Sequence, residues 1–178
     1  MGGAQATTSN ASRRRVVVAL LALSTLIGTA SVAVAQTPVE TARERADRFL
    51  RFVAAPTCRD NLVVVMAWQA NEFTQARWNP LATTHRMKRS ASFNEVGVQD
   101  YVSLTQGLRA SAETLTGGAT SYGYQVILGA LGRCDDAVTT AEAIRASAWC
   151  RGCSNGGYVV ELVPIVEQYF DRYTALHA

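Results

Sequence analysis

The order of charged and apolar residues after position 38 first predicts an amphipathic helix. Over residues 39–55 charged side chains cover one side, while apolar side chains recur at helical spacing on the other: Ala46, Phe49, Leu50 and Val53. A helix of this kind packs one face against a core and turns the other to water. Proline cannot continue a helix without losing a backbone hydrogen bond, so we expect Pro56 to end this element.

The next segment, residues 57–72, is much more apolar. Every residue from 62 to 68 is apolar, which predicts a helix that runs through the core. Thr57 and Asp60 offer side-chain caps at its start, and we expect it to end near Glu72. The same valine-rich run also suits a buried strand. We favour the helix because the segment has a cap, about a dozen residues and no internal turn signal.

Residues 73–102 are the least regular part of the chain. Asn79 and Pro80 mark a turn, and residues 85–92 are polar and basic, as expected of an exposed loop. A short hairpin or a few extended pieces are expected from the spaced apolar residues that follow: Phe93, Val96, Val98 and Tyr101.

Four further helices are expected after this stretch. Ser103 and Gln106 form a capping box for a helix that runs to Thr116 and stops at two glycines. The others are expected over residues 122–131 with a stop at Gly132, over residues 135–145, and over residues 158–176 with a kink or restart at Pro164. The chain is therefore predicted to be mostly α, with about six helices and little strand.

The first 35 residues have the pattern of a secretion signal. Three arginines at positions 13–15 precede an uncharged apolar stretch over residues 16–35, which ends in Ala33-Val34-Ala35 before Gln36. A signal peptidase cleaves after small residues placed in this way. An uncleaved anchor is the alternative, since about 20 apolar residues can span a bilayer. We favour cleavage, with a signal peptide over residues 1–35 and a mature domain over residues 36–178.

The charge balance excludes some classes of partner. The chain has 17 Lys and Arg against 14 Asp and Glu, and three of the arginines but none of the acids lie in the predicted signal. The mature part is therefore formally neutral, and it has no basic stripe of the kind that nucleic-acid-binding proteins carry. We expect a monomer of one domain, with no nucleic-acid partner and no membrane contact after cleavage.

All four cysteines lie in the mature part: Cys58, Cys134, Cys150 and Cys153. An even number in an exported chain indicates disulfides, and four cysteines allow three pairings. We favour a local Cys150–Cys153 bridge, which leaves Cys58 to pair with Cys134. A Cys-x-x-Cys redox motif would need a preceding strand, and a four-cysteine zinc site would need a second pair at that spacing. We therefore expect neither a metal nor another cofactor.

Glu72 is the main candidate for a catalytic residue. This single carboxylate lies at the C-terminal end of the predicted apolar helix, next to a loop rich in Asn, Thr and aromatic residues. Burial and the negative end of a helix both favour the protonated carboxyl, which is what a general acid needs. Rings and amides nearby suit a sugar, which stacks on aromatic faces and hydrogen-bonds through its hydroxyls. A solvated surface glutamate is the commoner explanation of such a position.

Several spaced motifs add a resemblance to this picture. Trp68 and Glu72 lie one helical turn apart and are followed by Asn79-Pro80-Leu81, Thr83 and Thr84. Further along stand Phe93-Asn94, Gly97-Val98, Tyr101 and Ser103, then Gly107, Ala110, Thr114 and Leu115, and finally Ser147 and Trp149. Over about residues 48–160 this order resembles small lysozyme-like proteins of bacteria and their phages. It is more distantly similar to bacterial peptidoglycan glucosaminidases and transglycosylases.

The resemblance implies a lysozyme-like helical fold that cleaves the glycan of peptidoglycan, with Glu72 as the general acid. It also implies a substrate cleft with five candidate residues: Trp68, Trp78, Asn79, Thr83 and Tyr101. The two tryptophans would pack behind the carboxylate or stack on a sugar. Hydrolysis and internal transfer, as in lytic transglycosylases, are both open.

The chain departs from the family pattern next to the candidate acid. Phe73 follows Glu72 where the pattern has glycine, and Ala82 replaces an asparagine. Glu95 and Asp100 are candidates for the second carboxylate that most glycosidases use. The alternative function is therefore a catalytically inactive lysozyme-like module that binds cell-wall glycan or a protein partner. A secreted thiol oxidoreductase is a third possibility and would require a reactive Cys150.

Overall fold

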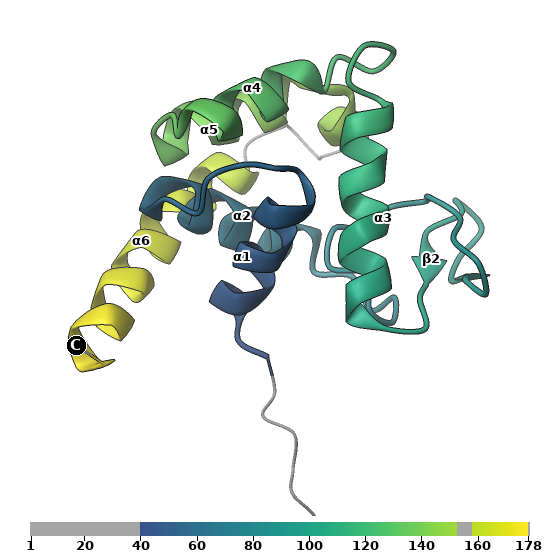
Figure 1. The fold of residues 1–178 in the computed structure, drawn as a ribbon, viewed down its shortest axis with the longest axis horizontal. Coiled ribbons are helices and arrows are strands. Elements are labelled where there is room, and N and C mark those ends of the chain that lie inside the picture. Colours follow the sequence, from purple (N-terminus) through teal and green to yellow (C-terminus); the bar gives the residue numbers. More distant parts are fainter. Residues whose placement is uncertain (1–39, 153–157, 178) are drawn as a thin grey trace, which may run out of the picture. The chain divides into compact units, whose positions relative to one another are not determined.

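The computed structural model describes residues 40–152 and 158–177. The predicted signal peptide over residues 1–35 lies outside the described residues. Within them the protein is mostly helical, as predicted, with a two-stranded antiparallel sheet (Figure 1). The elements in chain order are α1 (Ala42–Phe52), α2 (Arg59–Glu72), β1 (Ala91–Ser92), β2 (Gln99–Asp100), α3 (Leu104–Gly117), α4 (Gln125–Arg133), α5 (Ala137–Ala146), the short 3-10 helix η1 (Ala148–Gly152) and α6 (Tyr158–His177).

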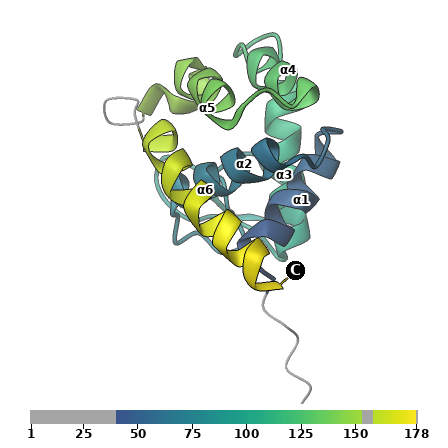
Figure 2. The same ribbon diagram turned by 90° about the vertical axis from the view of Figure 1, so that its left-hand side faces the viewer.

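Helix α2 is the centre of the core. The valine-rich run is helical, as predicted, and all of its residues from 61 to 68 except Met66 are buried. Helix α6 packs along α2, and α1 and α5 cover other sides of it (Figure 2). Because α2 is apolar all round and enclosed in this way, burial of its side chains contributes roughly 1.5–3 kcal/mol for each large one. The position of its last residue, Glu72, is fixed by this packing.

Helices α1 and α2 differ in how they begin. Thr41 and Glu44 form a capping box at α1, with the Glu44 backbone N–H donating to Thr41 Oγ1. The predicted cap of α2 by Thr57 or Asp60 is wrong. The helix begins one residue after Cys58, and no side chain hydrogen-bonds its first turn as a cap.

The predicted stop of α4 at Gly132 is also wrong. The helix continues to Arg133 and ends at Cys134, whose φ of 55° and ψ of 44° place it in the left-handed region. The side chain of Cys134 is held there by a disulfide to Cys58. A covalent bond thus replaces the glycine that usually ends a helix in this conformation.

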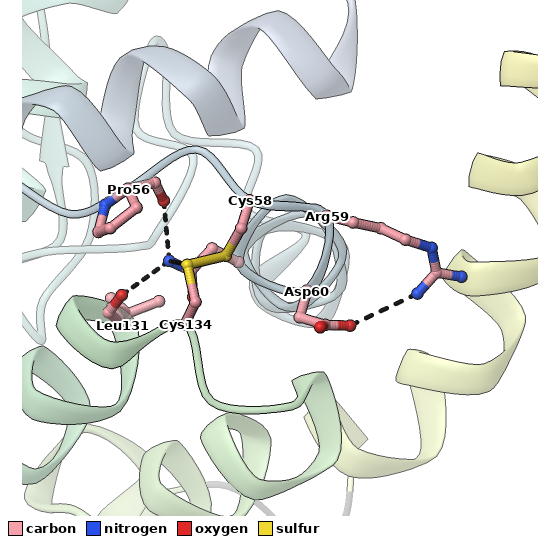
Figure 3. The surroundings of a disulfide bond; sticks show 7 residues. Pro56, Cys58, Arg59, Asp60, Leu131 and Cys134 are labelled. Atoms are coloured by element: carbon pink, nitrogen blue, oxygen red, sulfur yellow. Dashed lines mark hydrogen bonds and ion pairs between the residues drawn. A yellow bond between two sulfur atoms is a disulfide. The ribbon is translucent and has the colours of Figure 1, made fainter.

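The Cys58–Cys134 disulfide confirms one predicted pairing and joins the start of α2 to the end of α4 (Figure 3). Asn61 lies beside it, and its Nδ2 donates to Pro56 O at 2.8 Å and to Leu131 O at 2.7 Å. These bonds tie the two helix ends together through buried polar groups as well as through sulfur. Cys153 lies outside the described residues, so its pairing with Cys150 stays a prediction.

The irregular region contains the short hairpin that the sequence indicates. Ala91 pairs with Asp100 and Ser92 with Gln99, and this small sheet lies beside α3 (Figure 1). Ser103 then caps α3, because the backbone N–H of Gln106 donates to its hydroxyl at 3.2 Å. Of the described helices, none combines the length and the apolar content that crossing a bilayer requires.

Candidate active site

Glu72 is the last residue of α2 and carries a partly buried carboxylate. Its Oε1 accepts two hydrogen bonds from indole N–H groups, one from Trp68 at 3.3 Å and one from Trp149 at 3.2 Å. Trp68 lies one turn earlier on α2, whereas Trp149 belongs to η1. Its Oε2 accepts no hydrogen bond from a described residue and is not among their buried unpaired atoms. One oxygen is therefore held by two indoles, and the other has no hydrogen-bond partner among the described residues.

The surroundings of Glu72 favour its protonated form. Burial raises the pKa of this carboxyl, and the indole N–H groups of Trp68 and Trp149 oppose the rise because they stabilise the ionised form. No described cationic side chain forms an ion pair with it. The net effect is a carboxyl that keeps its proton to a higher pH than an exposed glutamate does. This is the protonation state that a general acid requires before it acts.

An aromatic cluster holds the two indole donors in place. Trp68 and Trp149 meet edge to face with ring centroids 4.9 Å apart, and Phe49 packs against the other side of Trp68 at 6.1 Å. Tyr124 lies against Trp149 at 5.6 Å. Trp68 has no exposed surface, so it packs behind Glu72 and is not open to a ligand. Edge-to-face packing of this kind keeps both N–H groups aimed at one oxygen.

Trp149 has a role at this site that the sequence did not indicate. It lies 77 residues after Glu72, and only the fold brings the two together. The single available signal was the Ser147-x-Trp149 motif, which belonged to the resemblance without a function attached to it.

Asn79 stabilises the loop that follows α2 through hydrogen bonds of its side-chain amide. It is buried, and its Nδ2 donates to Thr83 O and to Gln99 O, both at 2.8 Å. Its Oδ1 accepts from the Thr83 backbone N–H at 3.0 Å. The asparagine predicted to line a cleft thus uses both polar atoms of its amide to fasten the loop to β2.

Thr83 and Tyr101 are buried in the same way. The Thr83 and Thr114 hydroxyls hydrogen-bond each other at 2.6 Å, which joins the loop to α3. The Tyr101 hydroxyl donates to His85 O at 2.6 Å, and burial raises the pKa of this phenol. Both side chains therefore position the loop, and neither presents a free polar group to a ligand.

Of the five candidate substrate-binding residues, Trp78 is the one whose side chain is accessible at the surface. Its side chain is 50% exposed, and its φ of 57° lies in the left-handed region. The backbone there packs so closely on α3 that a Cβ on Gly107 would lie 1.6 Å from Trp78 O. Phe73, the residue after Glu72, is 87% exposed. Two aromatic side chains of the loop are thus available to a partner.

The two candidates for a second carboxylate lie in the hairpin region. Asp100 Oδ1 accepts the backbone N–H of Arg77 at 2.6 Å, so this carboxylate also fastens the loop. Glu95 is exposed at the hairpin turn. Neither is hydrogen-bonded to Glu72, whose partners among the described residues are the two indoles.

A pocket of about 460 Å³ is lined in part by Tyr124, whose ring contacts Trp149 of the indole cluster. Its lining comes from the segment at Thr84 and His85, the last turns of α3, the connection between α3 and α4, and Ala148 of η1. Glu72 is not among the lining residues. The pocket and the candidate acid are linked through Tyr124 and Trp149, whose rings are in contact. Nowhere in residues 40–152 and 158–177 do three or more acidic, histidine or cysteine side chains gather as they would around a metal ion.

Comparisons of this chain with protein-family models, with curated proteins and with solved structures find no match. The likeness to lysozyme-like proteins therefore stays a prediction from its motifs.

Proposed function

We propose that this chain is an exported peptidoglycan-cleaving glycosidase or lytic transglycosylase in which Glu72 is the general acid. The observation that carries the proposal is the partly buried carboxyl at the end of α2, with one oxygen held by two indoles and the other without a partner among the described residues. Burial raises its pKa. Perturbed acids of this kind cluster at catalytic sites.

The arrangement suits both stages of an acid-catalysed bond cleavage. Before reaction, burial keeps the proton on Glu72. As the glycosidic C–O bond breaks, the proton passes from Oε2 to the leaving oxygen, and the bonding electrons go with that oxygen. The carboxylate that remains is stabilised by the N–H groups of Trp68 and Trp149 on Oε1. The same two donors hold the carboxyl in one orientation throughout.

A mechanism with one protein carboxylate fits the site best. Asp100 fastens the loop, and no second acid contacts Glu72 among the described residues. In such a mechanism the anomeric carbon is attacked by the acetamido group of the substrate, or by an internal hydroxyl that forms an anhydro sugar. The first route ends in hydrolysis by water, and the second releases the product by internal transfer.

The exported location of this proposal has independent support. The N-terminal pattern is that of a cleaved signal, and Cys58 and Cys134 form a disulfide. Such bonds persist mainly in oxidising compartments outside the cytoplasm. A substrate in the cell envelope is consistent with that location.

An inactive glycan- or protein-binding module is the second candidate function, and a specific observation favours it. Phe73 replaces the glycine of the family pattern directly after Glu72 and is almost fully exposed, with Trp78 half-exposed on the same loop. Exposed aromatic side chains next to a carboxylate serve binding as well as catalysis.

The test compares glycan release from purified peptidoglycan by the exported, oxidised protein and by its Glu72→Gln variant. Glutamine keeps the shape of the side chain, and its amide oxygen can accept both indole hydrogen bonds. Its amide is not acidic, so it cannot protonate the leaving oxygen. Glu142→Gln is the matched control, because Glu142 is a surface carboxylate on α5 paired with Arg145. Loss of release in Glu72→Gln alone supports the enzyme. Absence of release in all three folded proteins, with all sedimenting with the glycan, supports the binding module.

A further inference from the structure

The pocket beside Tyr124 has a lining that is unusual in its charge. Its one carboxylate is Glu113 on α3, whose Oε2 lies 3.0 Å from Nε2 of His85 on the loop. No lysine or arginine is among its lining residues. Glu113 Oε1 accepts no hydrogen bond from a described residue, so this oxygen is open to a donor group of a ligand. A carboxylate oxygen in a lining without lysine or arginine favours a cationic donor such as an ammonium group over an anion.

Two tyrosines, Tyr122 and Tyr124, also line this pocket. The rings of Tyr122 and Tyr124 stack with centroids 5.8 Å apart and planes at 29°. Tyr124 is fixed, because it packs on Trp149 and because a Cβ on Gly118 would lie only 2.6 Å from its ring. Tyr122 is 59% exposed and offers a free aromatic face. Such a face attracts both the C–H side of a sugar ring and an ammonium group.

The remaining lining includes two threonines. Thr84 is exposed, whereas the Thr114 hydroxyl is bonded within the fold to Thr83 Oγ1 and to Ala110 O. Gly117 and Gly118 also line the pocket, at the C-terminal end of α3, which carries partial negative charge. The volume of about 460 Å³ lies within the range of small-ligand pockets and accommodates a short saccharide.

We propose that this pocket binds a sugar unit with a free primary amine, such as a glucosamine residue that lacks its acetyl group, with the ammonium on Glu113 and the ring on Tyr122. The preference for an amine is argued from the pocket itself. The choice of a sugar as the molecule that carries the amine rests on the proposed function. The inference deepens that proposal, because it implies a preference for glycan strands that have lost some of their acetyl groups.

The experiment measures binding without cleavage. The Glu72→Gln form of the exported protein is titrated with a glucosamine tetramer and with an N-acetylglucosamine tetramer at about pH 6, where the sugar amine is protonated. Calorimetry gives the affinity, and backbone NMR shifts locate the ligand. We expect the free-amine tetramer to bind about five- to tenfold more tightly, as befits one partly exposed charge pair with an aromatic face. The shifts should centre on Gly117, Gly118 and Tyr122.

Variants test which residues cause the preference for the free-amine tetramer. In the Glu72→Gln background, Glu113→Gln should remove the preference for the amine, Tyr122→Ala should weaken both ligands, and Glu142→Gln should change neither affinity. Equal affinities for the two tetramers, or a preference that survives Glu113→Gln in a folded protein, would overturn the inference. Equal affinity for a tetralysine peptide would overturn the assignment to a sugar.

The two proposals fail separately. Cleavage that depends on Glu72, without any amine preference, would leave the proposed function standing and reject this pocket. Amine-selective binding in a protein that never cleaves glycan would keep the pocket and reject the enzyme.

Discussion

Replacing Trp149 with phenylalanine removes one of the two N–H donors to Glu72 while it keeps a ring against Trp68. The lost hydrogen bond stabilises the ionised carboxylate, so its removal raises the pKa of Glu72 beyond the rise that burial already causes. Hydrogen bonds to charged groups contribute roughly 1.5–3 kcal/mol, and one pKa unit corresponds to about 1.4 kcal/mol. The bond of 3.2 Å is long and its acceptor is partly exposed, which places the effect at the lower end. We therefore expect a further rise of about 1 pKa unit.

The assay is a titration of the Glu72 side-chain carboxyl by NMR in protein labelled at glutamate, with Glu72→Gln to assign the signal. Trp78→Phe is the matched control, because Trp78 is half-exposed and donates no hydrogen bond to Glu72. If Glu72 is the general acid, the alkaline limb of the pH–rate profile should move upward by the same amount in Trp149→Phe. A Glu72 pKa that stays constant or falls in this variant would refute the hydrogen-bond account of the site.

Three further predictions concern stability. Replacing both Cys58 and Cys134 with serine should lower the free energy of unfolding by about 4–5 kcal/mol in denaturant titrations, because the bridge closes a loop with a sequence separation of 76; a loss below about 1 kcal/mol would contradict the bridge's role. Gly107→Ala should cost about 1–3 kcal/mol by the same measurement, since its methyl group would overlap the carbonyl of Trp78. Glu72→Gln should unfold at higher temperature than the wild type near pH 7 and at the same temperature below about pH 4. The reason is that the folded protein binds the Glu72 proton more tightly than the unfolded chain does. This contribution to stability is present while the carboxyl is protonated and is lost as the pH rises through the folded-state pKa, whereas glutamine stays neutral throughout.

The sequence was most informative where one local pattern decided the structure. The apolar run of α2 predicted both its helical form and its central position, because a helix without a polar face has to be enclosed. Ser103 and Gln106 predicted the start of α3 for a similar reason, since a capping interaction spans only a few residues. Pairing of Cys58 with Cys134 followed from the closeness of the other two cysteines in the sequence.

Predictions that depended on tertiary packing were less complete. The motif around Asn79, Thr83 and Tyr101 was recognised, but a motif does not show which way a side chain points. In the fold all three are buried and bonded to protein groups, so they shape the loop. Trp149 was missed as the partner of Glu72 because 77 residues separate them. Gly132 has the residue type of a helix stop, but α4 continues to Arg133 and ends at the disulfide-bonded Cys134.

The central claim is that Glu72 donates the proton that breaks a glycosidic bond. The most direct measurement compares two pKa values, that of the Glu72 carboxyl by NMR in the free protein and that of the alkaline limb of kcat/KM for peptidoglycan cleavage, which reports the free enzyme. Agreement of the two, at a value above the ordinary glutamate pKa of about 4.3, is the predicted result. Cleavage that continues unchanged as Glu72 loses its proton would contradict the claim.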